Sequence, residues 1–192
     1  MIILPALIWG RADNIFVKQG LQNSSSVQIP SMIKLAIKLD KAAYVGEGKN
    51  FWPHVHVDEG EEAVIPSLAC PEIRQVGKFF QIIFDAIVSR KQLASGRDGY
   101  YFLESGEYTQ LSVVQVIAKA LYARGKVASP EAVQLSEADL VPEPYKALVA
   151  GVGSNIRARG GRSRKLGWNP PQTTEDFFAS VRAEVDYLLE AH

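Results

Sequence analysis

The chain has 192 residues, of which 47% are hydrophobic, a composition that excludes a disordered chain. Its formal net charge is zero, so the overall charge argues neither for nor against nucleic acid or an anionic membrane as a partner. Its one cysteine, Cys70, excludes an internal disulfide and fits a reducing, cytoplasmic setting. The apolar start lacks a basic segment and falls short of the roughly 20 residues that span a bilayer, so we expect neither signal nor membrane anchor.

The first third of the chain predicts alternating strands and helices. Ile2 to Ile8 reads as one strand that is apolar on both faces and ends at Gly10, as in a parallel sheet covered by helices. The elements expected next are an irregular polar segment over 11–26, a helix opened by Pro30 and running to about 39, a strand and turn over 44–48, and a strand over 51–57.

The remaining two thirds predict mainly helices. A helix over 76–88 carries an apolar stripe that we expect to be buried: Val76, Phe79, Phe80, Ile83, Phe84, Ile87 and Val88. A buried strand over 99–103 follows, and a helix capped by Thr109 runs to about 124 with Val113, Val114, Ile117 and Leu121 inward. The last elements expected are a helix from about Ser136 to the glycines at 151 and 153, an extended segment over 155–158, and a helix capped by Thr173 that buries Phe177, Val181, Val185 and Leu188 or Leu189. We expect three to five short strands and an α/β fold.

Five segments, in this order, resemble the extended short-chain dehydrogenase/reductases, and most closely the fungal proteins of the NAD-dependent epimerase/dehydratase type. They are LPALIWG at 4–10, IPSMIKLAIK at 29–38, YVGEGKNFWPHVHVDE at 44–59, GYYFLESGEYT at 99–109 and SRKLGWNP at 163–170. The resemblance implies an α/β fold with an incomplete Rossmann-like parallel sheet and a small α/β substrate-binding region. Residues 1–192 would then be the C-terminal part of that domain.

Full members of this family have an N-terminal half with a glycine-rich turn for the dinucleotide phosphates and a catalytic Tyr-x-x-x-Lys pair. The tyrosine relays a proton while hydride moves to or from the nicotinamide, and the lysine lowers the tyrosine pKa. The resemblance implies that Met1 follows the catalytic helix, that the cofactor is NAD or NADP, and that this chain is inactive alone. The substrate would be a nucleotide-sugar or another carbonyl or alcohol compound.

Two motifs in the chain are similar to the glycine-rich turn and to the Tyr-x-x-x-Lys pair of full family members. Gly151-Val152-Gly153 has Ile156 where a third glycine should stand, so we interpret it as a turn that leaves a helix. Tyr122 and Lys126 have the spacing of the catalytic pair, but Gly125 breaks the helix between them. We therefore assign no catalytic residue.

The resemblance points to Pro5, Ala6, Leu7 and Ile8 as one wall of the cofactor pocket. The alternative interpretation of these residues is a plain core strand followed by a turn. A strand can serve in both ways.

Strand alternation places His54, His56 and Asp58 on one face, a pattern that could bind a metal. The family has a similar run without a metal, where the acidic pair caps the next helix. We therefore expect no metal site, and we expect His56 and Asp58 to be structural residues at the floor of the substrate cleft.

The only dense basic run is Arg157, Arg159, Arg162, Arg164 and Lys165. In family members that act on sugar nucleotides, an arginine in this region pairs with the substrate diphosphate. The resemblance therefore assigns this role to Arg157 or Arg159. The alternative is a solvated loop and helix. Nucleic acid is a poorer partner, because aromatic residues for base stacking are absent apart from Trp168.

Residues 60–75 interrupt the family pattern and would be an insertion that bulges out as a poorly ordered loop. It is either an error of the gene prediction or a natural surface loop. Two other functions stay open: a non-catalytic NAD(P)-sensing regulator of the negative-transcriptional-regulator type, and a standalone interaction module.

Overall fold

The computed structural model describes residues 1–12, 15–21, 23–57 and 75–190, so most of the expected insertion lies outside the described residues. The elements are β1 (Ile2–Pro5), β2 (Leu7–Trp9), α1 (Ile15–Lys18), α2 (Gln28–Lys38), β3 (Ala43–Tyr44), β4 (Phe51–His56), α3 (Gln75–Val88), β5 (Tyr100–Leu103), β6 (Gly106–Thr109), α4 (Gln110–Tyr122), β7 (Val133–Gln134), α5 (Glu143–Val152), α6 (Gly161–Lys165) and α7 (Thr174–Glu190). The α/β fold class is confirmed, with short strands that pair mainly in parallel.

The opening strand is bent into two pieces, where the sequence predicted one strand from Ile2 to Ile8. β1 pairs in parallel with β5, and β2 pairs in parallel with β4. Pro5 has no N–H to continue a ladder, and the next residue, Ala6, donates its N–H to Leu103 O at 2.9 Å. The proline therefore marks the point at which the strand changes partners.

The remaining strands are short. β6 pairs antiparallel with β4, and β3 pairs in parallel with β7. The described residues thus hold seven strands, more than the three to five expected. The opening strand is divided in two, β6 was not expected, and a strand of two residues such as β7 leaves no periodic signal in a sequence.

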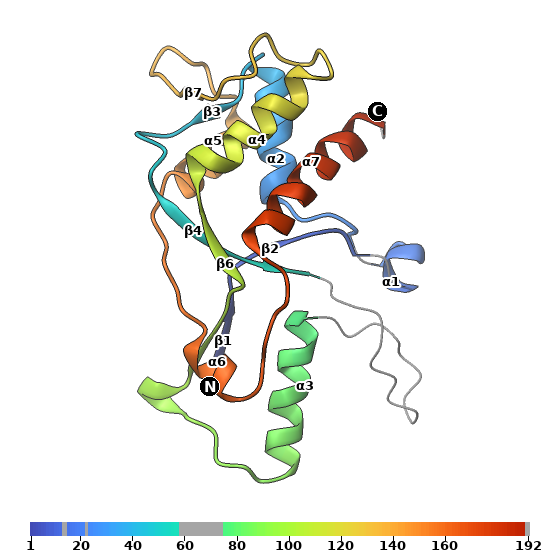
Figure 1. Ribbon diagram of the computed structural model, residues 1–192, viewed down its shortest axis with the longest axis vertical. Coiled ribbons are helices and arrows are strands. Elements are labelled where there is room, and N and C mark those ends of the chain that lie inside the picture. The colour runs from blue at the N-terminus through green and yellow to red at the C-terminus, as the bar shows by residue number, and fades with distance from the viewer. Residues whose placement is uncertain (13–14, 22, 58–74, 191–192) are drawn as a thin grey trace.

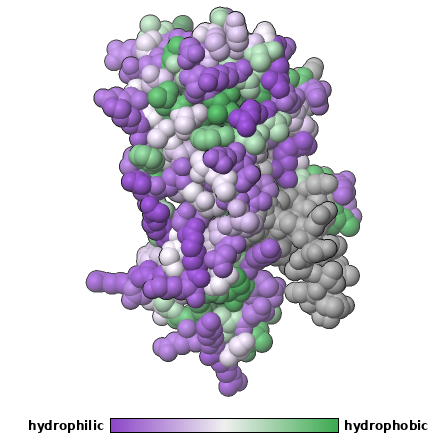
Figure 2. Space-filling view, in the orientation of Figure 1, coloured by the Kyte–Doolittle hydropathy of each residue, from purple (hydrophilic) through white to green (hydrophobic). Residues whose placement is uncertain are grey.

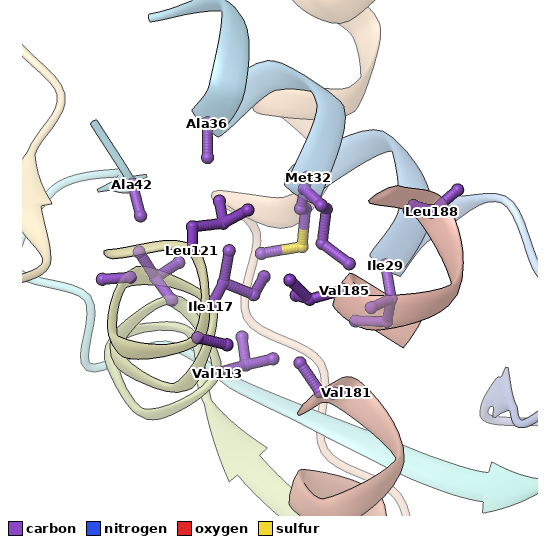
Figure 3. Close-up of a cluster of buried hydrophobic side chains, with 14 of the residues drawn as sticks. Ile29, Met32, Ala36, Ala42, Val113, Ile117, Leu121, Val181, Val185 and Leu188 are labelled. Atoms are coloured by element: carbon purple, nitrogen blue, oxygen red, sulfur yellow. The ribbon is translucent and has the colours of Figure 1, made fainter. Parts of the chain in front are cut away.

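The larger core lies between the helices of the upper part of Figure 1, where α4 and α7 pack against α2. Figure 3 shows the inward side chains of these helices, among them Val113, Ile117, Val181 and Val185, converging on one cluster. The predicted inward residues of α4 and the stripe of α7 are confirmed as buried. Both predicted caps form: Thr109 Oγ1 accepts from Ser112 N at 3.2 Å, and Thr173 Oγ1 accepts from Asp176 N at 3.3 Å.

The smaller core lies between α3 and β5. The prediction of a fully buried α3 stripe is wrong: Phe79 and Ile83 are buried, whereas the four other stripe residues whose side chains are described are exposed, namely Phe80, Phe84, Ile87 and Val88. The β5 strand is likewise buried on one face only. The helix period predicts that apolar residues share faces, but only the neighbouring elements decide how many of those faces are covered.

Two further expectations need correction, the start of the helix before Gly151 and the irregular segment over 11–26. The helix expected from Ser136 begins at Glu143, because Ser136 and Asp139 form a turn and Pro142 precedes the helix. The irregular segment over 11–26 contains α1, and the basic run contains α6. Gly153 caps the end of α5, so its interpretation as a turn leaving a helix is confirmed.

Candidate functional site

A hollow of about 460 Å³ lies between the opening strand and the segment before α2. Its strand wall consists of the residues that the resemblance assigns to the cofactor pocket, namely Pro5, Ala6, Leu7 and Ile8. The opposite wall is the polar run 23–26, which the sequence analysis left without a role, together with Gln28. The hollow reaches Gly10, just past the carboxyl end of β2, where ligands bind in open parallel α/β sheets.

The walls of this hollow are suited to an uncharged part of a ligand. Its strand side is apolar, its loop side offers hydroxyl and amide groups, and none of its described lining residues is charged. Such walls suit a ring with a carboxamide or hydroxyl substituent. They do not suit a diphosphate, which needs cations or several converging backbone N–H groups.

His56 lies at the carboxyl end of β4 and lines a second hollow, of about 290 Å³, with Trp9, Pro171, Gln172 and Asp176. Its ring meets the Trp9 ring edge-on, with the centroids 4.3 Å apart. A hydrogen bond from the Thr173 backbone N–H lowers the pKa of Asp176, and the charge of His56 adds to this. Gln172 Oε1 is buried and has no hydrogen-bond partner among the described residues. The hollow is therefore lined by a histidine, a carboxylate and a glutamine whose amide oxygen is buried.

The two predicted arginines line neither hollow. Arg157 makes a two-pronged ion pair with Glu107, with Nη2–Oε2 at 2.6 Å, and its guanidinium lies 4.6 Å from the centre of the Phe51 ring. The hydrogen bond from Arg157 lowers the pKa of Glu107, and the charge of Arg159 adds to this. Arg159 is exposed. Arg157 would have to leave Glu107 before it could bind a diphosphate.

The basic run also contains a structural arginine that the sequence did not distinguish. Arg164 Nη1 lies 2.5 Å from Oε1 of the buried Glu104, and its Nη2 donates to Glu104 O at 2.7 Å. The same carboxylate oxygen accepts from Gly160 N at 2.9 Å. These bonds fix α6 on the end of β5, and no local sequence pattern pairs residues 60 positions apart.

His54 forms a buried polar network that links β2, β4 and α7. Trp9 Nε1 donates to His54 Nδ1 at 3.0 Å, and because an indole nitrogen can only donate, His54 carries its proton on Nε2. That Nε2–H faces Thr174 Oγ1 at 3.0 Å, and the Phe177 ring stacks on the imidazole at 4.9 Å. Burial lowers the pKa of His54 to about 4, although the charge of Glu104 raises it. His54 is therefore neutral and structural.

The other motifs singled out from the sequence lie as follows. Tyr122 ends α4 and is exposed, and Gly125 follows in the left-handed region at φ +64°. Within the described ranges, no group of three or more His, Cys, Asp or Glu side chains is placed to hold a metal; Asp58, a member of the predicted trio, lies outside them. No described helix is both long enough and apolar enough to cross a membrane.

No protein-family model and no curated protein matches this sequence. Solved structures do match it. A UDP-N-acetylglucosamine 4-epimerase from Methanobrevibacter ruminantium, solved with UDP-N-acetylmuramic acid, is 12% identical with a TM-score of 0.50, over 99% of this chain and 46% of that one. A UDP-glucuronic acid 4-epimerase from Bacillus cereus, solved with a fluorinated UDP-sugar and NAD, is 14% identical with a TM-score of 0.49, over 100% of this chain and 45% of that one.

The chain thus spans slightly less than half the length of the solved proteins that it matches. Likeness at this level of identity concerns the fold alone. The chain therefore has a partial Rossmann-like α/β fold of the kind found in the Methanobrevibacter epimerase.

Proposed function

We propose that this chain is the substrate-binding part of an NAD(P)-dependent oxidoreductase or epimerase of the extended short-chain dehydrogenase type, and that it has no turnover alone. The observation that carries the proposal is the hollow bounded by Pro5, Ala6, Leu7 and Ile8 at the carboxyl side of two parallel strand pairs. The epimerase-like fold agrees with it.

The residues present fit one end of a nicotinamide dinucleotide. The apolar strand wall would pack on the nicotinamide ring, and Ser24, Ser25, Ser26 or Gln28 would hydrogen-bond its carboxamide. The described part of the chain has no glycine-rich phosphate turn and no usable tyrosine–lysine pair. A bound cofactor would supply hydride transfer, while these residues would orient its ring and exclude water.

The proposed substrate class is a nucleotide-sugar or a related carbonyl or alcohol compound. His56 would contact its reacting part from the second hollow, together with the Gln172 amide. The exposed Arg159, or Arg157 after release from Glu107, would bind the diphosphate. We propose a cytoplasmic location for the protein.

Calorimetric titration of the purified chain with NAD(H) and NADP(H) tests the first part. Because only one end of the dinucleotide would be held, we expect a Kd weaker than about 100 μM. Binding near about 1 μM would contradict the proposal. Such binding without turnover is what the alternative predicts, namely a non-catalytic NAD(P)-sensing regulator.

Titration with UDP and UDP-glucose tests the substrate class. Arg159→Ala is expected to weaken UDP binding by about fivefold, because one charge-assisted contact to phosphate is lost. Arg182→Ala removes an exposed arginine of α7 that lines neither hollow and serves as the matched control. Equal losses in both variants, or no UDP binding by the unmodified chain, would count against a nucleotide-sugar substrate.

A further inference from the structure

A small cavity adjoins both hollows described above, at the turn that follows β2. Its volume is about 10 Å³, which is space for one water-sized group. It shares Gly10 and Ser26 with the hollow at the opening strand, and it shares Trp9 with the hollow at His56. A group bound in this cavity therefore has room for the rest of its molecule in a neighbouring hollow.

A buried carboxylate lines the cavity and lacks a partner. Glu184 of α7 is 6% exposed, and its Oε1 has no hydrogen-bond partner among the described residues. The other buried carboxylate of the described chain, Glu104, is fully engaged, because it pairs with Arg164 and accepts from Gly160 N. Unpaired buried polar atoms are rare in folded proteins, so Glu184 Oε1 points to a missing donor.

The charge of Glu184 also lacks a cation at the cavity. No lysine, arginine or histidine stands among the described residues that line it. Burial raises the pKa of Glu184, and the smaller effects of a hydrogen bond with Ser25 and of the charge of Arg11 lower it. The Arg11 guanidinium lies 3.4 Å from the centre of the Tyr187 ring and outside the cavity lining. A cation inside the cavity would therefore stabilise the carboxylate.

The other walls of the cavity suit a cation that carries several N–H donors. Ser26 and Ser180 contribute hydroxyl groups, and a hydroxyl oxygen can accept hydrogen bonds. Trp9 and Phe177 contribute aromatic rings whose centroids are 5.6 Å apart. Aromatic rings attract a cation that lies over their faces, and tryptophan does so most strongly.

We propose that this cavity is a binding site for a primary ammonium group, with the Glu184 carboxylate as its counter-ion. An ammonium head has three N–H donors and no acceptor, which matches Glu184 Oε1 and the hydroxyls of Ser26 and Ser180. The head is about as large as a water molecule, so it fits the space. A water molecule would satisfy the oxygen but would leave the charge of Glu184 without a counter-ion.

The ligand class is thus a small primary amine. The site lies beside the hollow proposed for the nicotinamide ring, but it does not depend on that proposal, because its lining is complete without a dinucleotide.

Thermal unfolding of the unmodified chain tests the site with methylammonium chloride as the probe, against tetramethylammonium chloride and NaCl at the same concentration. A probe with so few heavy atoms binds with a Kd of about 10 mM. At about 100 mM it is therefore expected to raise the Tm by about 3 °C over NaCl. Tetramethylammonium has the same charge but is too large for the cavity, so no rise is expected with it.

Two variants link the effect to the carboxylate. Glu184→Gln keeps the size of the side chain and an acceptor for Ser25 but removes the charge, so the rise with methylammonium is expected to disappear. Glu190→Gln removes an exposed carboxylate of the same helix that lines none of the three spaces, and this matched control should keep the rise. The comparison of the two cations needs no variant and stands even if Glu184→Gln does not fold.

Three results would overturn the proposal. The first is a Tm in methylammonium equal to that in NaCl, which would leave the cavity to water. The second is an equal rise with tetramethylammonium, which would indicate binding at the exposed apolar side chains of α3; hydrophobic atoms gather at that lower end of the molecule in Figure 2, where Figure 1 places α3. The third is a full rise in a folded Glu184→Gln variant.

Discussion

Protonation of His54 should destabilise the fold over a defined pH range. The side chain is fully buried, its Nδ1 accepts from Trp9 and its Nε2–H faces Thr174. A second proton would have to sit on Nδ1, where the indole N–H already points. Burial lowers the pKa of His54 from 6.5 to about 4, so the folded state resists this proton and the unfolded chain does not.

The size and sign of the effect follow from linkage. Each unit of pKa difference between the two states is worth about 1.4 kcal/mol, so the fall from 6.5 to about 4 corresponds to about 3 kcal/mol. Between these two pH values the unfolded state binds more protons, so stability rises with pH. The His54 contribution is complete above about pH 6.5, is lost as the pH falls to about 4, and changes no further below that.

Urea unfolding followed by tryptophan fluorescence from about pH 7 to pH 4 measures this loss. His54→Gln keeps an acceptor for Trp9 and a donor for Thr174 but does not titrate. Its stability should therefore be lower at pH 7 and should fall less than that of the unmodified chain on acidification, because only carboxylates with a lowered pKa, such as Glu107 and Asp176, still contribute a slope. His56→Gln replaces a histidine that takes no part in the hydrogen bonds of His54, and this control should keep the slope of the unmodified chain. If the chain and His54→Gln lose equal stability on acidification, the assignment of the slope to His54 is refuted.

Three further contacts are tested by substitutions in the same unfolding assay. Gly106→Ala should cost about 1–3 kcal/mol, because its Cβ would lie 2.5 Å from a hydroxyl of α7, whereas Gly161→Ala, whose Cβ meets nothing within 4 Å, should be close to neutral. Glu104→Gln should cost about 1–2 kcal/mol, reduced from the value for a fully buried pair because the Arg164 side chain is 39% exposed; an unchanged midpoint would show that α6 docks without this pair. Thr109→Ala should cost about 1 kcal/mol through loss of the α4 cap, and no loss would mean that packing alone starts this helix.

The sequence by itself determined the features that depend on near neighbours in the chain. The inward residues of α4 and α7 follow from the helix period, and the caps at Thr109 and Thr173 follow from side chains that satisfy backbone N–H groups within three residues. The left-handed turn at Gly125, three residues after α4 ends at Tyr122, likewise depends on near neighbours, because glycine adopts a positive φ without steric cost.

Only the tertiary structure decided the features that depend on distant partners. It placed Arg164 on Glu104 and Arg157 on Glu107, although the sequence shows one uniform basic run. It brought Trp9 to His54 and the serine run to the opening strand, and it left Phe84 exposed on a stripe that looked fully apolar. Ion pairs, burial and hollows depend on which segments come into contact although they are tens of residues apart in the sequence. A local sequence pattern carries no information about such long-range contacts.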